Sequence, residues 1–91
     1  MFNFLNLYNS FEEFYDSFFK GNEIEFLYRG QRFYILPRYN DKGNITGVYL
    51  GAFGDEKEAV FTTKDELYNA KIGVELLGNI LSQIEITWYN I

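Results

Sequence analysis

The fold of this chain is decided by residues 23–39, which read EIEFLYRGQRFYILPRY. Apolar side chains occupy every second position of residues 24–28, and this two-residue period is typical of a strand with one buried face. Gly30 and Gln31 follow as a tight turn, since glycine at the first central position suits a type II′ hairpin. Residues 32–39 then form a second strand. The segment therefore predicts an antiparallel hairpin.

Two further strands are expected after the hairpin, at residues 45–53 and 59–61, with polar turns between them. Gly47 and Gly51 lie inside the first of these strands, which indicates a bulge or a close backbone approach. Pro37 cannot donate a ladder hydrogen bond, so the strand that contains it is expected to end there or to run along an edge. Consecutive strands joined by short turns predict an antiparallel meander.

Helices are expected before and after these strands, at residues 10–20 and 63–81. Each begins with a capping box, in which the hydroxyl of Ser10 or Thr63 accepts from a backbone amide three residues later and a Glu side chain reaches back. Apolar side chains then recur at three- and four-residue spacing, as they do on one face of a helix. Gly73 is expected to break the second helix into two segments.

A last strand, residues 84–89, ends the pattern. The sequence thus predicts a single domain over residues 1–91 with an α+β fold, a two-layer sandwich. Its sheet would be an antiparallel meander of four to five strands. The N-terminal helix and the broken C-terminal helix would cover one face of this sheet and leave the other face exposed.

The composition excludes most kinds of catalytic and metal site. The chain has no Cys and no His, so it lacks thiolate chemistry, the commonest general base and the commonest transition-metal ligand. It contains no G-x-S-x-G nucleophile elbow. The carboxylate pairs Glu12 with Asp16 and Glu23 with Glu25 are interpreted as solvated faces of a helix and a strand. We therefore expect a protein with no enzymatic activity, no metal and no other cofactor.

Charge and hydropathy indicate the cellular location of the protein and the kinds of surface that it does not bind. The net charge is −5, which argues against broad affinity for the phosphate backbones of nucleic acids. No stretch approaches the roughly eighteen apolar residues of a membrane span, and the first residues lack the pattern of a signal peptide. We expect a cytoplasmic protein that does not bind membranes.

Three segments resemble those of a group of small proteins from low-GC Gram-positive bacteria and their phages. They are residues 11–14 (FEEF), 21–30 (GNEIEFLYRG) and 65–72 (DELYNAKI), short motifs of a resemblance that extends over nearly the whole chain. The resemblance implies an α+β meander. For relatives on mobile elements it also implies the role of a small inhibitor protein, and it assigns no catalytic residue.

Acidic side chains form the first candidate binding surface. They gather on the predicted first helix, before the fourth strand and at the start of the second helix: Glu12, Glu13, Asp16, Asp55, Glu56, Glu58, Asp65 and Glu66. Such a surface can occupy the basic groove of a nucleic-acid-binding protein. With the small size and the resemblance, it predicts a non-catalytic inhibitor of a host nucleic-acid enzyme. An anti-CRISPR protein that blocks a Cas effector is the specific case.

Tyrosines and arginines form the second candidate surface, on the central hairpin: Arg29, Arg32, Tyr34, Arg38 and Tyr39. Both residue types are enriched in the hot spots of protein interfaces. The alternative function is binding of single-stranded nucleic acid, in which the rings stack on bases and the arginines neutralise phosphates. Association of two copies of the chain also stays open.

Overall fold

A computed structural model describes residues 2–90 of the protein. Its elements, in chain order, are β1 (Phe2–Asn3), α1 (Phe4–Leu7), α2 (Phe11–Phe18), β2 (Glu23–Tyr28), β3 (Gln31–Tyr39), β4 (Ile45–Ala52), β5 (Glu58–Phe61), α3 (Lys64–Tyr68), β6 (Lys71–Ile72), β7 (Glu75–Leu76), two 3-10 turns (Leu77–Asn79 and Leu81–Gln83) and β8 (Glu85–Asn90). The expected α+β class with an antiparallel sheet is confirmed. None of the described helices is long and apolar enough to cross a membrane.

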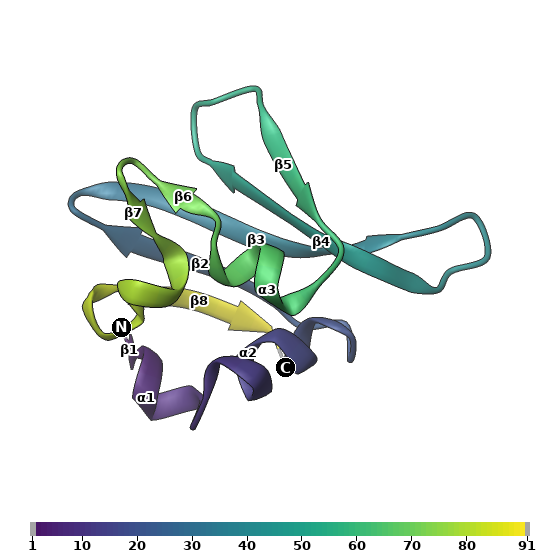
Figure 1. Ribbon diagram of the computed structural model, residues 1–91, viewed down its shortest axis with the longest axis horizontal. Coiled ribbons are helices and arrows are strands. Elements are labelled where there is room, and N and C mark those ends of the chain that lie inside the picture. The colour runs from purple at the N-terminus through teal and green to yellow at the C-terminus, as the bar shows by residue number, and fades with distance from the viewer. Residues whose placement is uncertain (1, 91) are drawn as a thin grey trace.

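Six strands form one antiparallel sheet in the order β1-β8-β2-β3-β4-β5 (Figure 1). Strands β2 to β5 follow one another as the expected meander, whereas β8 lies between β1 and β2. Ile86 of β8 is opposite Phe2 on one side and Phe26 on the other. The expected number of four to five strands is too low because β1 has only two residues, too few to show an alternating pattern.

The turn between β2 and β3 differs from the expected one. Tyr28 is paired with Gln31, so the two central residues are Arg29 and Gly30. Their φ angles are 50° and 81°, and positive φ at both central positions is what a type I′ turn requires. The type II′ turn predicted one residue later is wrong, because the register of the paired strands sets the turn and a lone glycine does not.

Pro37 lies inside β3, which continues to Tyr39, so the expected strand end at Pro37 is wrong, whereas the expected edge position is found on the side that faces β2. The amide of Phe53 donates to the carbonyl oxygen of Arg32, so even-numbered residues of β3 bond toward β4 and odd-numbered ones toward β2. Pairing with β2 stops at Ile35. In the described chain no strand therefore lies opposite the proline nitrogen, and no ladder bond is lost.

One face of the sheet builds the hydrophobic core. Its buried side chains alternate along four strands: Ile24, Phe26, Tyr28, Phe33, Ile35, Val48, Leu50 and Ile86. Phe14 and Phe18 of α2 and Leu67 of α3, all fully buried, belong to the same cluster. Half of the predicted capping box of α2 is present, since the Oγ of Ser10 accepts from the amide of Glu13 at 3.1 Å, whereas the Glu13 carboxylate accepts from the Nδ2 of Asn9 instead of the Ser10 amide. The side chains that alternate with the buried ones form the other face, called the outer face below.

The segment after α3 is not the second half of a helix, contrary to the prediction. Residues 71–76 form the β6–β7 hairpin, which turns at Gly73 with a φ of 67° and leads into the two 3-10 turns. Buried Leu77 and Ile80 lie three residues apart, the repeat of a 3-10 turn, and this spacing imitates a helical stripe. Val74, expected in the same stripe, is 88% exposed at the tip of the hairpin.

Candidate functional site

The outer face of the sheet consists of three rows of side chains across the strands. Residues opposite each other in an antiparallel ladder point to the same side of the sheet. The rows are Glu85-Leu27-Arg32-Phe53, Trp88-Glu25-Tyr34-Gly51-Glu58 and Leu36-Tyr49-Val60. None of the large apolar side chains in these rows belongs to the core cluster of the described residues.

A continuous set of contacts, the outer-face network, holds the middle of this surface. The Nη2 of Arg32 donates to the Oε1 of Glu25 at 3.0 Å. The same guanidinium lies 4.5 Å from the ring centroid of Phe53, and the Phe53 ring meets the Tyr34 ring edge-on at 5.5 Å. Such contacts restrict the rotamers of the long side chains in the middle of this surface.

Tyr34 extends the network to the edge strand. Its hydroxyl donates to the Oε2 of Glu58 at 2.5 Å, and its ring lies directly over Gly51, where a Cβ would overlap the ring. The hydrogen bond to the Glu58 carboxylate, with a smaller contribution from burial, raises the pKa of Tyr34 to about 12. Tyr34 is therefore a neutral phenol at physiological pH. At Gly51 the close neighbour is a side chain and not the predicted backbone. The predicted backbone approach is found at Gly47, where a Cβ would lie 2.6 Å from the carbonyl oxygen of Phe61.

Large apolar side chains surround the network. Phe53, Trp88 and Val60 are 43%, 44% and 45% exposed, and Leu27, Leu36 and Tyr49 are half-buried. Sequence reasoning selected Tyr34 but not Trp88 or Leu27. The signal for Leu27 was present, because it is an apolar residue on the polar side of the β2 alternation.

The three arginines do not form one basic surface. Arg29 lies in the β2–β3 turn, where its guanidinium is over the ring of Tyr28, 5.3 Å from the centroid. Arg32 forms an ion pair with Glu25, and Arg38 is six residues further along β3, or about 20 Å away. Tyr39, at the end of the strand, is 54% exposed. The structure thus separates the residues that a phosphate backbone would need side by side.

The acids of α2 share an exposed side of the helix. Glu12, Glu13 and Asp16 are all exposed. The Oε1 of Glu12 lies 3.9 Å from the Nζ of Lys64 on α3, and the Oε2 of Glu13 accepts from the Nδ2 of Asn9 at 3.2 Å. These bonds are at the surface, so they leave the negative potential of the helix largely in place.

The remaining predicted acids surround the β4–β5 turn and the start of α3, and all are exposed: Asp55, Glu56, Glu58, Asp65 and Glu66. Glu66 has a structural task, because its Oε1 accepts from the amides and hydroxyls of Thr62 and Thr63 at 2.9–3.2 Å. The bonds from Thr62, ahead of those from Thr63, hold the pKa of Glu66 below its ordinary value. Part of the acidic surface therefore caps a helix.

The outer face and the acidic surfaces differ in the groups that they present to solvent. Within residues 2–90, no group of three or more acidic side chains is arranged to hold a metal ion. The outer face offers apolar area, a fixed carboxylate at each end of the network and one aromatic hydroxyl.

Comparison of the chain with models of known protein families, with curated proteins and with solved structures finds no match.

Proposed function

We propose that this protein is a non-catalytic protein-interaction module whose contact surface is the outer face. The observation that carries the proposal is the exposure of Phe53, Trp88 and Val60 on one side of the sheet, around a fixed polar network. Exposed apolar patches rimmed by polar residues mark sites of protein association.

The residues of the outer face match what a hot spot needs. Tyr, Trp and Arg dominate the binding energy of protein interfaces, and central anchors surrounded by polar groups exclude water best. Tyr34 and Arg32 are already held by Glu58 and Glu25, so binding would cost little side-chain entropy. A partner would bury Phe53 and Trp88 and leave both carboxylates at the rim.

The partner class that we propose is a basic nucleic-acid-binding enzyme, which the protein would inhibit. Support comes from the net charge of −5 and from the exposed acids of α2 and of the β4–β5 turn. Complementary charge accelerates the encounter and favours basic partners over acidic ones. A Cas effector remains the first such enzyme to test.

Affinity capture from the cell that makes the protein tests the contact surface. The bait is the intact chain, compared with Phe53→Ser/Trp88→Ser and with the matched control Leu5→Ser, which changes an exposed apolar residue of α1. We expect a protein that is retained by the intact chain and the control but lost with the double variant. The purified pair must then bind directly, with the same dependence on Phe53 and Trp88. Equal capture by all three baits would reject the outer face.

An inhibition assay tests the partner class. Candidate Cas nucleases would cleave their substrates with and without the protein, then with Glu12, Glu13 and Asp16 reversed to Lys and separately with Asp55, Glu56 and Glu58 reversed. Loss of inhibition on reversal of the α2 acids supports the acidic mechanism. Loss on the second reversal alone also follows from breaking the bond between Tyr34 and Glu58, so it does not separate this mechanism from the outer face. Inhibition that survives both reversals but not Phe53→Ser/Trp88→Ser assigns the contact to the outer face alone, and no inhibition across the panel rejects this partner class.

Binding of single-stranded nucleic acid is the second candidate, favoured by one observation: Tyr34, Tyr49, Phe53 and Trp88 share a sheet face. Rings on such a face can stack on bases. Fluorescence anisotropy with labelled oligonucleotides would detect binding that weakens steeply with salt. Micromolar affinity at physiological ionic strength, lost on Arg32→Ala and Arg38→Ala, would replace the protein-interaction proposal.

A further inference from the structure

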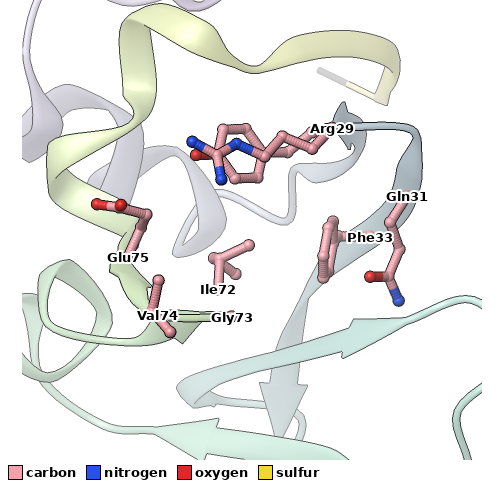
Figure 2. Close-up of a pocket in the computed structure, with 8 residues that line it drawn as sticks. Arg29, Gln31, Phe33, Ile72, Gly73, Val74 and Glu75 are labelled. Atoms are coloured by element: carbon pink, nitrogen blue, oxygen red, sulfur yellow. The ribbon is translucent and has the colours of Figure 1, made fainter.

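A cleft of about 280 Å³ lies between the tips of two hairpins, away from the outer face. Its walls come from the β2–β3 turn and from the β6–β7 hairpin, as Figure 2 shows. Phe33 and Ile72, both more than nine-tenths buried, provide an apolar floor, and exposed Val74 stands at the rim. The volume corresponds to roughly nine water molecules, or a ligand of about ten non-hydrogen atoms.

One residue of the cleft wall carries a buried polar group without a partner. Tyr28 lines it and is only 6% exposed, and its hydroxyl is inaccessible to solvent and makes no hydrogen bond to any described residue. Most buried hydroxyls in folded proteins are satisfied, so an orphan one requires an explanation such as a ligand. A ligand atom that accepts from this hydroxyl would remove the penalty.

Arg29 occupies a backbone position that suits it poorly. The first central residue of a type I′ turn needs a positive φ, which Asn, Asp and Gly adopt most readily, yet Arg29 stands there with a φ of 50°. Strained residues of this kind cluster at binding sites. Its side chain runs over the Tyr28 ring and reaches from the turn toward the β6–β7 hairpin (Figure 2).

The cleft carries one charge of each sign. Glu75 of β7 lines it opposite the turn that holds Arg29. No ion pair joins Arg29 or Glu75 to another side chain among residues 2–90. A cation and an anion that are both unpaired at the rim of a small apolar cavity match a ligand that itself carries both charges.

We propose that this cleft binds a free apolar α-amino acid. Its carboxylate would bind the guanidinium of Arg29 and draw it outward from the ring, so that the hydroxyl of Tyr28 could donate to the same carboxylate. Its ammonium group would face Glu75. Its side chain, of the size of leucine or phenylalanine, would lie against Phe33 and Ile72. This site shares no residue with the outer-face network. The proposal that it binds an amino acid can therefore be tested independently of the proposed function.

NMR titration of the ¹⁵N-labelled protein tests the site with four probes. L-leucine and L-phenylalanine carry both charges, 4-methylpentanoate lacks the ammonium group, and 3-methylbutylamine lacks the carboxylate. We expect saturable shifts of the amide signals of Arg29, Gly30, Gly73 and Glu75 with the amino acids. Each probe that lacks one charge should bind about tenfold more weakly, the effect of one charge-assisted hydrogen bond.

Two variants separate the binding role from the structural one. Arg29→Asn places a residue suited to the turn, so the thermal stability should not fall while amino-acid affinity drops about tenfold or more. Glu75→Gln should weaken leucine binding and strengthen 4-methylpentanoate binding, because it removes the charge that repels a lone carboxylate. Arg38→Asn is the matched control, since Arg38 lies outside the cleft, and it should leave both affinities unchanged.

The remaining outcomes overturn the proposal. Equal affinity for leucine and for 4-methylpentanoate would remove the assignment to a zwitterion. Absence of saturable shifts at millimolar amino acid, or shifts that persist unchanged in both Arg29→Asn and Glu75→Gln, would remove the site.

Discussion

The two faces of the sheet use the same kind of aromatic residue in opposite ways. On the inner face, Phe26 and Phe33 stack at 5.2 Å, and neither is more than 9% exposed. On the outer face, Tyr34 and Phe53 meet edge-on at 5.5 Å. A hydrogen bond from Tyr34 to Glu58 and a cation–π contact between Arg32 and Phe53 hold the two rings at the surface. Adjacent residues of β3, Phe33 and Tyr34, thus belong to different environments.

Aromatic content alone therefore does not locate a binding surface. The groups that each ring contacts do locate it. A ring surrounded by other apolar groups contributes its burial to stability. A ring that is half in water and fixed by a carboxylate or a guanidinium contributes less to stability and keeps its area for another molecule. The comparison predicts that substitutions on the two faces separate loss of folding from loss of binding.

The largest expected difference between the two faces comes from removing one ring from each of them. Phe14→Ala empties a fully buried site whose ring contacts Phe4, Tyr8 and Phe18 at centroid distances of 5.0–5.2 Å. We expect it to lower the free energy of unfolding by about 3–5 kcal/mol, a large part of the total for a small domain. Phe53→Ala should cost about 1 kcal/mol, because it removes only one aromatic pair and one cation–π contact.

Urea denaturation of both variants gives the two free energies of unfolding. Equal losses would mean that the outer face is as much a part of the core as the inner one. A Phe14→Ala variant with unchanged unfolding would contradict the packing of α2 in the core.

The antiparallel sheet and α2 could be predicted from the sequence because local patterns decide them. Alternation and turn residues fix β2 to β5, and the Ser10 cap with its apolar repeat fixes α2. The position of β8 could not be predicted, because non-local pairing decides which strand it joins. The segment after Gly73 was misread because 3-10 and α-helical repeats are too similar over eight residues.

The candidate site could be predicted only in part. Alternation along β3 places Arg32, Tyr34 and Arg38 on one face, and this much is visible in the sequence. Phe53 and Trp88 join them through the pairing of β4 with β3 and of β8 with β2, which no local pattern encodes. The acids are exposed as expected, but their hydrogen bonds depend on side-chain geometry.

A smaller effect tests whether the outer-face network is a fixed structure. A Cβ at Gly51 would overlap the ring of Tyr34, so Gly51→Ala forces that ring off the sheet and away from Glu58. We expect a loss of about 1–2 kcal/mol, from the displaced contacts and the hydrogen bond.

A double-mutant cycle with Tyr34→Ala provides the control for this loss. In the Tyr34→Ala background the ring is absent, so Gly51→Ala should cost almost nothing, and the coupling free energy should equal most of the single-variant loss. Additive effects in the cycle would show that Gly51 is required for its backbone alone.

The smallest expected effect is a pH dependence of the free energy of unfolding that comes from Tyr34 on the outer face. The pKa of Tyr34 is raised from 10.0 to about 12, first by its hydrogen bond to Glu58, so the folded state keeps a proton that the unfolded chain loses. The stabilisation from this bond is therefore complete below pH 10 and is lost as the pH rises from about 10 to 12. Burial also raises the pKa of Tyr8 and Tyr15, so the protein as a whole loses stability in alkali for several reasons.

The difference between the intact chain and Tyr34→Phe isolates the outer-face contribution, because every other group titrates in both. We expect this difference, measured as the free energy of unfolding in urea, to favour the intact chain below pH 10 and to shrink steadily above it. A difference that stays constant up to pH 12 would mean that Tyr34 and Glu58 are not hydrogen-bonded in solution, and the outer face would then be a flexible surface instead of an ordered one.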